Sequence, residues 1–334
     1  MAGGRSELIR ALALTGPTAS GKTAISLSLA ERIGAEIISC DSMQIYKGMD
    51  IGTAKATPSE RAAVPHHMLD IIAPNESYSA EDYRRDSLAV ARDIASLGKW
   101  PLFVGGTGLY IDTVMRAAPA ESPPSDPIVR ERLGAIAAEQ GVEALWKRLC
   151  EVDPESAEKT HANNLRRVIR ALEIYEVSGK TKSYFDRLSR EAVGDADVFM
   201  MTLDFHNRET LYRRVDERVD VMMREGLLSE VESLWRGGLL DPANTSAQAI
   251  GYKEIVRALQ GECSLGDAVE EIKLSSRRYA KRQLTWFRHE ENAVKIYVDN
   301  EDGSLRTLGS LADETTELAL SRIRKWSENE SDRA

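Results

Sequence analysis

Short apolar runs alternate with amphipathic stretches along the first third of the chain. A short apolar run bounded by turn residues is typical of a buried strand, whereas apolar residues spaced at helical intervals indicate a helix that faces a core. These patterns predict strands at residues 11–15, 36–39 and 102–104 and helices at residues 23–33 and 79–97. Such alternation is typical of an α/β fold with a parallel sheet, whose ligands bind at the carboxyl ends of the strands.

The pattern changes at residues 117–127, where four prolines lie among serine and aspartate. This composition is typical of a linker. The spacing is helical from residue 128 to about residue 188, and residues 198–203 form one more predicted strand. Helices are predicted from there to Arg324, one of them over residues 215–234.

This order of elements predicts an insertion. We expect an α/β core formed by residues 8–121 and 196–326, interrupted by an all-helical domain at residues 122–195. A separate C-terminal domain is the alternative division. The 334 residues are enough for two domains at roughly 150 residues each.

The amino-acid composition and net charge exclude several classes of protein. With 42% hydrophobic residues the chain can form a core, and a net charge of −9 excludes a generally basic surface but not a local basic face. Cys40, Cys150 and Cys263 are too far apart for a disulfide framework or a CxxC metal site. There is no apolar run of about 18 residues and no signal peptide at the start, so we expect a soluble cytoplasmic protein.

One motif between a predicted strand and a predicted helix fits GxxxxGK[ST] at every position. Its backbone amides and the helix N-terminus favour phosphate, its lysine reaches a terminal phosphate, and its threonine hydroxyl holds Mg²⁺. The motif predicts a site for a di- or triphosphate without saying which molecule carries it. Its residues, called here the phosphate loop, are Gly16, Pro17, Thr18, Ala19, Ser20, Gly21, Lys22 and Thr23.

Two further loops are expected at the same edge of the sheet. Asp41 and Ser42 follow the second strand, and the strand at residues 102–104 runs into a glycine-rich turn that contains Thr107. An aspartate at a strand end is a candidate general base or magnesium ligand, or simply a turn residue. A nucleotide kinase would also show a lid with paired arginines and a Walker B strand, and the sequence shows no clear form of either.

Nine segments together resemble the tRNA dimethylallyltransferases (tRNA isopentenyltransferases) in their order and spacing. The resemblance spans about residues 8–290 and is closest to the bacterial type, since no Cys/His cluster follows Arg288 to form a zinc finger. Asn164 departs from the acidic residue expected there in many relatives. The segments are residues 16–23, 41–46, 48–55, 65–70, 105–110, 153–154, 163–173, 249–253 and 277–288.

The resemblance implies a P-loop NTPase-like parallel core that holds dimethylallyl diphosphate rather than ATP. It implies transfer of the dimethylallyl group to N6 of the adenosine 3′ to the anticodon. Asp41 is then the base, with Thr107 hydrogen-bonding near the bridging oxygen. Lys22, Arg218, the loop amides and Mg²⁺ on Thr23 would stabilise the leaving diphosphate.

The expected partner is a tRNA anticodon stem-loop, bound by a monomer without a membrane. The segment at residues 277–288 is basic, has no acidic residue and contains aromatic residues that could stack on bases. Residues 166–170 form a second basic cluster, although surface helices offer a plainer explanation for both. The expected tRNA-binding residues are Asp41, Ser42, Met43, Gln44, Thr107, Arg130, Asn164, Leu165, Arg166, Arg167, Val168, Gly251, Tyr252, Lys253, Arg277, Arg278, Lys281 and Arg282.

Three alternatives stay open at this point. An adenylate (cytokinin-type) isopentenyltransferase would carry out the same chemistry on a free nucleotide, but it would need neither the basic segment nor the insertion. A P-loop nucleotide kinase would transfer phosphate. An RNA-binding protein without catalysis would bind tRNA and form no product. His66 and His67 are adjacent, so on an extended segment they point in opposite directions and are expected to be structural.

Overall fold

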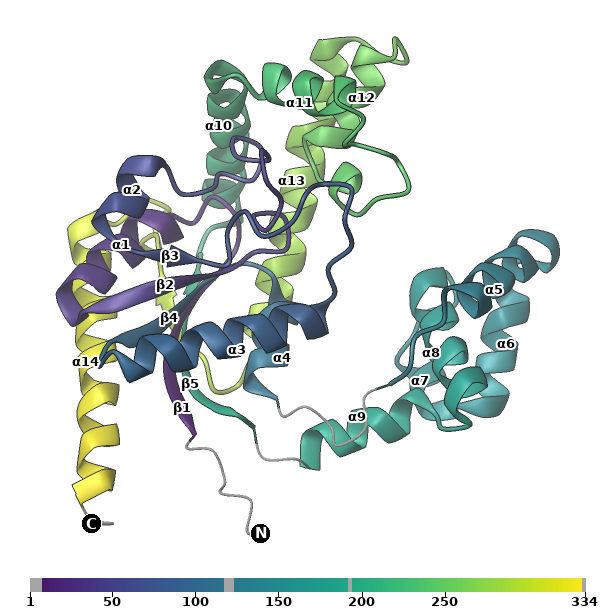
Figure 1. Cartoon of the computed structure of the whole chain (residues 1–334). Coiled ribbons are helices and arrows are strands. Elements are labelled where there is room, and N and C mark those ends of the chain that lie inside the picture. Colours follow the sequence, from purple (N-terminus) through teal and green to yellow (C-terminus); the bar gives the residue numbers. More distant parts are fainter. Residues whose placement is uncertain (1–7, 117–122, 192–193, 332–334) are drawn as a thin grey trace. The chain divides into compact units, whose positions relative to one another are not determined.

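A computed structural model of the chain describes residues 8–116, 123–191 and 194–331 (Figure 1). The chain divides into two compact units, one formed by Met1–Met115 with Ala196–Ala334 and the other by Arg116–Asp195. Each unit has hydrophobic clusters of its own. Within the described ranges, no helix is long and apolar enough to cross a membrane.

The first unit contains a six-stranded sheet in which every pair of neighbouring strands is parallel. The strand order is β3-β2-β4-β1-β5-β6. The predicted α/β class is therefore confirmed. The strands are β1 (Ile9–Thr15), β2 (Ala35–Cys40), β3 (His66–His67), β4 (Trp100–Gly105), β5 (Ala196–Asp204) and β6 (Val294–Tyr297).

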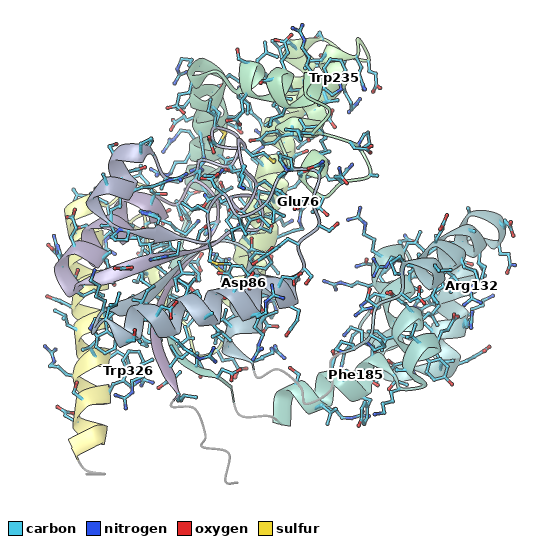
Figure 2. The ribbon with its side chains drawn as sticks, viewed as in Figure 1. Glu76, Asp86, Arg132, Phe185, Trp235 and Trp326 are labelled. Carbon is cyan, nitrogen blue, oxygen red and sulfur yellow. The ribbon has the colours of Figure 1, made fainter. Side chains whose placement is uncertain are left out.

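Both faces of the sheet are covered by helices, which is why most side chains on both faces of its inner strands are apolar. Successive side chains of β1 point to opposite faces, so Leu12 and Leu14 join one cluster while Ala11 and Ala13 join the other. On the first face Trp326, labelled in Figure 2, stacks on Trp100 with ring centroids 5.7 Å apart. The helices are α1 (Lys22–Ile33) and α14 (Leu308–Ser331) on that face, and α3 (Ala80–Ser96) and α4 (Gly108–Met115) on the other.

A third hydrophobic cluster lies beside the segment that follows β2. Ile45, Tyr46 and Met49 of that segment pack against side chains from the C-terminal helices. This packing ties a loop near the N-terminal end of the chain to helices some 200 residues later, and it shapes the carboxyl edge of the sheet. The C-terminal elements are α10 (Arg208–Glu225), α11 (Leu227–Arg236), η1 (Ser246–Gln248), α12 (Tyr252–Leu259) and α13 (Leu265–Arg288). Helix α2 (Pro58–Ala63) lies between β2 and β3 along the chain and contributes no side chain to this cluster.

Two sequence predictions in this unit are wrong. The helix expected over residues 215–234 is two helices, because Gly226 adopts a left-handed φ of 104° that ends α10. The region predicted to be helical up to Arg324 also contains strand β6, which pairs with β5 at the edge of the sheet. β6 has only four residues, and so short a run gives a weak periodic signal.

The second unit is all-helical in its described part, as the spacing predicted. Leu133, Leu149 and Leu172 form its core with other side chains from the same helices. Of the predicted linker, residues 117–122 lie outside the described residues, and Pro127 is the first residue of a helix. The helices are α5 (Pro127–Gln140), α6 (Val142–Val152), α7 (Pro154–Glu158), α8 (Leu165–Ser178) and α9 (Lys182–Glu191).

The carboxylate of Glu173 connects the start of the helical unit to its core through hydrogen bonds. The side chain of Glu173 is fully buried and accepts hydrogen bonds from the amide of Asp126 (2.8 Å), from Arg130 (3.0 Å) and from Arg170 (3.0 Å). Burial alone would raise the pKa of Glu173, but these donors and charges outweigh it and lower the pKa below its ordinary value. The ionised form is therefore the one that stabilises the fold.

Replacing Glu173 by glutamine keeps the volume but removes the charge, so we expect the free energy of unfolding of this unit to fall by about 1.5–3 kcal/mol at pH 7. Because the folded pKa lies below the unfolded one, this contribution exists above the unfolded pKa and is lost as pH falls through the folded pKa. Urea unfolding at several pH values measures it. Exposed Glu139 on α5 provides the control, and equal losses in Glu173→Gln and Glu139→Gln would contradict the prediction.

Candidate functional site

A cavity of ≈ 590 Å³ opens at the carboxyl ends of β1, β2 and β4. Its size is that of a small-molecule site, for which about 300–1,000 Å³ is usual. Residues from the three loops predicted to meet there line it, with side chains of α10 and α13. Among the lining residues are Thr18, Lys22, Thr23, Asp41, Ser42, Met43, Gln44, Gly105, Gly106, Arg218, Tyr279 and Gln283.

Two positions of the phosphate loop adopt backbone conformations that require glycine. Gly16 has a φ of 142°, and a Cβ there would lie 2.9 Å from the carbonyl oxygen of Leu203. Gly21, at the N-terminus of α1, has a φ of 90°. The ammonium of Lys22 donates to the carbonyl oxygens of Gly16 (3.0 Å) and Pro17 (2.7 Å), so it folds back over the loop.

The charges at this end of the cavity favour an anion. Burial lowers the pKa of Lys22 to about 7, and the nearby Arg218 adds to the effect, while Asp41 opposes it. Within the described part of the chain, Nε of Arg218 and Oγ of Ser20 are buried without a hydrogen-bond partner. Lys22, Arg218 and the orphaned hydroxyl of Ser20 lie beside a helix N-terminus, and they would gain hydrogen bonds and charge compensation from a phosphate group.

Asp41 and Thr107 lie beside each other at the ends of neighbouring strands. Oδ1 of Asp41 accepts from the amide of Met43 (2.9 Å), and burial raises the pKa of this carboxyl despite that bond and the nearby cations. The hydroxyl of Thr107 accepts from the amide of Ser42 (3.0 Å). A Cβ on Gly105 would lie 2.1 Å from the carbonyl oxygen of Cys40, so only glycine lets the two strand ends approach this closely.

Gln283 of α13 joins two of the loops and was not singled out as a site residue by the sequence. Its Oε1 accepts from the amide of Thr18 (2.8 Å), and its Nε2 donates to the carbonyl of Gly106 (2.8 Å). Tyr279, one turn earlier, lines the cavity and hydrogen-bonds Thr107, and burial raises its pKa. Both residues lie in a segment that the sequence marked only for its basic and aromatic residues.

Comparison with known proteins agrees with this geometry. A sequence model described as IPP transferase matches residues 44–290, and one described as Isopentenyl transferase matches residues 9–70. The chain belongs to the IPP transferase family.

Individual relatives of the family cover most of the chain. It is 51% identical over 277 residues to a Bacillus velezensis protein named tRNA dimethylallyltransferase, covering 83% of this chain and 87% of that one. A full-length tRNA isopentenylpyrophosphate transferase from Bacillus halodurans is 38% identical with a TM-score of 0.71, covering 97% and 99%. A eukaryotic dimethylallyltransferase solved acting on tRNA is 28% identical with a TM-score of 0.76, covering 96% and 80%.

The basic side chains of the segment at residues 277–288 lie on two different faces of α13. Arg277 pairs with Asp216 (2.6 Å) and Arg288 with Asp204 (2.7 Å), so both guanidinium groups are held in ion pairs within the protein. The other face is formed by residues that follow Arg278 at intervals of three or four along the helix. They line a second hollow, of ≈ 610 Å³. The residues that line this hollow are Arg278, Lys281, Arg282, Thr285, Trp286, His289 and Glu290, and Arg282 lines the first cavity as well.

The candidate RNA-binding residues of the helical unit differ in exposure. Asn164, Arg166 and Arg167 are exposed at the start of α8, and Leu165 packs partly against the core. The side chain of Val168 is fully buried, so only its backbone is available to a ligand. The guanidinium of Arg130 is engaged by Glu173. The five consecutive positions at residues 164–168 therefore present different chemistry to a ligand.

The predicted segment at residues 251–253 begins α12. Gly251 has a φ of 98°, and its amide donates to Glu254 (2.8 Å). Tyr252 is fully buried and lines the cavity, whereas Lys253 lies 3.6 Å from a carboxylate oxygen of Glu254. Of the three, the structure places Tyr252 at the site.

A cluster of three or more His, Cys, Asp or Glu side chains able to hold a metal is absent from the described residues. His67 hydrogen-bonds Glu36 (2.7 Å), and His66 hydrogen-bonds the carbonyl of Val64 (2.7 Å). Both histidines therefore have structural partners. Thr23, the last residue of the phosphate loop, lines the cavity, and its single hydroxyl would suit a Mg²⁺ ion that takes its other ligands from a bound phosphate and water.

Proposed function

We propose that this protein is a tRNA dimethylallyltransferase that uses dimethylallyl diphosphate to modify N6 of the adenosine 3′ to the anticodon. The observation that carries the proposal is one cavity whose lining brings two cations and a carboxylate close together. Lys22 of the phosphate loop and Arg218 of α10 supply the cations, and Asp41 supplies a half-buried carboxylate near both. Relatives at about half identity bear this name, and the family membership supports the same activity.

In the proposed reaction, N6 of the adenine attacks the allylic C1 of the donor. The new N6–C1 bond forms as the C1–O bond breaks, and the diphosphate leaves with the bonding pair. N6 is a weak nucleophile because its lone pair is delocalised into the ring, so Asp41 accepts its proton. Burial raises the pKa of Asp41, which makes its carboxylate a stronger base than an exposed one. Lys22, Arg218 and the loop amides stabilise the charge that develops on the diphosphate.

A magnesium ion is the metal that these residues suit, with the hydroxyl of Thr23 as its protein ligand. When bound, it would neutralise part of the charge on the diphosphate. Thr107 stays assigned to hydrogen bonding near the bridging oxygen. In the described structure its hydroxyl oxygen accepts from the amide of Ser42, and its hydrogen is donated to Oγ of Ser42 over a long 3.5 Å, so donation to the bridging oxygen would replace that second bond.

The RNA partner is an anticodon stem-loop whose reactive adenosine leaves the base stack to enter the cavity. Unstacking costs a few kcal/mol and is cheapest in a loop. The basic face of α13 would hold the backbone phosphates of that loop, and Arg166 and Arg167 of the helical unit would add further contacts. We propose that the enzyme acts as a cytoplasmic monomer.

Neutralising Arg278 and Arg282 together as glutamine should weaken tRNA binding and flatten its dependence on salt. Each lost phosphate contact lowers the slope of log K against log salt by about 0.7–0.9. Filter binding of unmodified tRNA at a series of salt concentrations measures both quantities. The exposed residues Arg324 and Lys325 of α14, changed to glutamine, control for net charge. An equal change of slope in the two double variants would remove the special role of the α13 face.

The proposed function is tested by incubating the protein with Mg²⁺, labelled dimethylallyl diphosphate and either unmodified tRNA or AMP. We expect label in tRNA alone, at one adenosine beside the anticodon. Label in AMP would move the function to cytokinin-type synthesis. Label in neither acceptor, with phosphate transferred from ATP to a nucleotide, would identify a kinase instead.

A further inference from the structure

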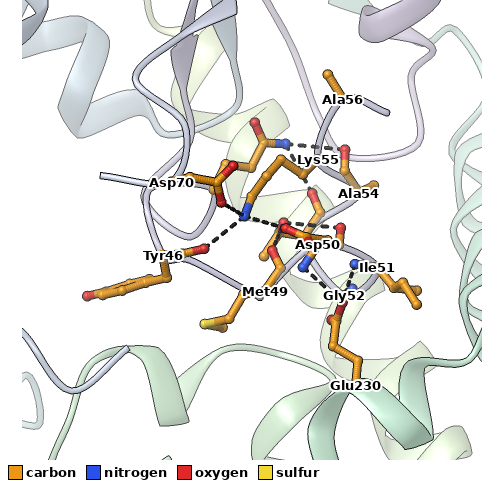
Figure 3. A network of polar contacts seen from close by, with 12 residues as sticks. Tyr46, Met49, Asp50, Ile51, Gly52, Ala54, Lys55, Ala56, Asp70 and Glu230 are labelled. Atoms are coloured by element: carbon orange, nitrogen blue, oxygen red, sulfur yellow. Dashed lines mark hydrogen bonds and ion pairs between the residues drawn. The ribbon is translucent and has the colours of Figure 1, made fainter. Parts of the chain in front are cut away.

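Three of the family-like segments supply no group to the transfer step, namely residues 48–55, 65–70 and 249–253. Their residues nevertheless join one polar network. Figure 3 shows the part formed by residues 48–55, Asp70 and Glu230, and Tyr252 of the third segment joins it through a hydrogen bond to Glu230. The network centres on a turn at residues 50–54, which lies between the segment after β2 and helix α11. The hydrogen bonds of this turn indicate a role for Glu230, which lies outside all three segments.

Glu230 of α11 binds the turn through its carboxylate. Oε2 accepts from the backbone amides of Asp50 (2.9 Å) and Ile51 (2.7 Å). Oε1 accepts from the amide of Gly52 (3.1 Å) and from the hydroxyl of Tyr252 (2.6 Å). A carboxylate offers about four acceptor positions, so this one is fully used, and three of its four donors belong to consecutive amides of one turn.

The opposite side of the turn is held by Lys55. Its side chain is fully buried, and its ammonium donates to the carbonyl of Tyr46 (2.8 Å), to Asp50 (2.6 Å) and to Asp70 (2.7 Å). All three donors of the ammonium are thereby used. Ala54, inside the turn, has a φ of 45°, a strained conformation that persists only where the surroundings enforce it.

The turn packs closely against α12 as well. A Cβ on Gly52 would lie 2.5 Å from the ring of Tyr252, so the backbone of the turn rests directly on that ring. Glu230 bonds both the amide of Gly52 and the hydroxyl of Tyr252, and it therefore fixes the two surfaces against each other.

The turn in return holds Gln44, which lies in the cavity wall three residues after Asp41. Nε2 of Gln44 donates to the carbonyl oxygens of Thr53 (3.1 Å) and Ala54 (3.3 Å). Its Oε1 accepts from the hydroxyl of Ser39 (2.7 Å), at the end of β2. Gly52, Thr53 and Ala54 line the cavity too. The bonds of the turn thus reach the segment that carries Asp41 and not the phosphate loop.

We propose that Glu230 is a positioning residue for the acceptor nucleoside: from α11 it fixes the turn at residues 50–54 and, through it, the amide of Gln44. This inference rests on the proposed function. It assigns the wall formed by the turn and Gln44 to the adenosine, and the wall formed by the phosphate loop to the diphosphate.

The decisive variant is Glu230→Gln. A glutamine at this position can accept through its carbonyl oxygen only, and its NH₂ group meets backbone donors that it cannot bond. We expect kcat/KM for tRNA to fall about 10- to 100-fold, since a displaced positioning group costs that much. The Kd for inorganic diphosphate should change less than about twofold, because independent sites couple weakly. The control is Glu232→Gln on the same helix, whose carboxylate pairs with Arg236 at the surface.

Hydrogen exchange provides a readout that does not depend on activity. In the unmodified protein the amides of residues 50–52 should be protected, and in Glu230→Gln they should exchange faster while the phosphate loop is unchanged. Circular dichroism establishes that each variant is folded. Should Glu230→Gln fail to fold, Glu230→Asp, which shortens the side chain but keeps the charge, is taken through the same measurements.

Faster exchange at residues 50–52 with a lower kcat/KM for tRNA and unchanged diphosphate binding supports the proposal. Unchanged exchange overturns it, because Glu230 would then not hold the turn. Faster exchange with unchanged kinetics overturns it too, because the turn would not position the acceptor. A loss of affinity for inorganic diphosphate as large as the loss of kcat/KM for tRNA would indicate a merely structural role and would also overturn the proposal. Failure of the unmodified protein to label tRNA at all would instead contradict the proposed function.

Discussion

Replacing Asp41 by asparagine is expected to lower kcat for tRNA prenylation by about 10²–10⁴-fold, the range for loss of a positioned general base. The amide keeps the shape of the side chain and can still accept the hydrogen bond from the amide of Met43. It cannot take the proton from N6. Binding of tRNA should therefore change little, and single-turnover rates measured at saturating tRNA isolate the chemical step.

The pH dependence provides a second signature of the base. Asp41 must be ionised to act, and its pKa is raised by burial, so the rate of the unmodified enzyme should fall as pH drops through that raised pKa. The asparagine variant should lack this acidic limb. Asp93, exposed on α3, is the matched control, and Asp93→Asn should keep the full rate. A rate for Asp41→Asn near that of the unmodified enzyme would exclude Asp41 as the base.

The central part of the fold was predictable because its physical signals are local. β1, β2 and β4 are mostly apolar on both faces, since helices cover both sides of the sheet, and such runs stand out in a sequence. β3 and β6 were not predicted. They have two and four residues at the two edges of the sheet, and their pairing with β2 and β5 comes from tertiary contacts rather than from their own composition.

The candidate site was predictable where a residue follows a strand directly. The phosphate loop and Asp41 were expected to converge because parallel strands end at one edge, and they line one cavity. Thr107 was expected in the same place, yet its hydroxyl bonds the amide of Ser42 and is not among the residues that line the cavity. Strand order determines which loops are neighbours, but it does not determine side-chain hydrogen bonds.

No pattern in the sequence marks Gln283 or Glu230 as a functional residue. Each is a single polar residue on an amphipathic helix, where an exposed side chain is the ordinary expectation. Their significance arises from partners roughly 180 to 265 residues away, namely Thr18 and Gly106 for Gln283 and the amides of residues 50–52 for Glu230. Arg277 shows the reverse case, since a basic residue expected to face RNA is held by Asp216 instead.

Replacing Lys22 by methionine is expected to lower kcat by about 10²–10³-fold, the usual cost of removing one donor to a developing negative charge. Methionine has similar length and stays apolar, so α1 and the loop should keep their fold. The affinity for inorganic diphosphate should fall as well, because the ammonium binds the ground state. Isothermal titration with inorganic diphosphate measures the binding, and single-turnover labelling of tRNA measures the chemistry.

The lowered pKa of Lys22 gives this prediction a distinctive pH profile. In the free protein the pKa is about 7, held down mainly by burial and then by Arg218. A bound diphosphate favours the charged ammonium and so raises its pKa. Binding is therefore unaffected by this group below pH 7 and weakens by up to about tenfold per pH unit above it, as the free lysine loses its proton. Lys22→Arg, whose guanidinium stays charged, should abolish that weakening between pH 7 and 9. A profile for Lys22→Arg that falls as steeply as that of the unmodified protein would assign the titration to another group, because the diphosphate itself gains charge equally in both experiments.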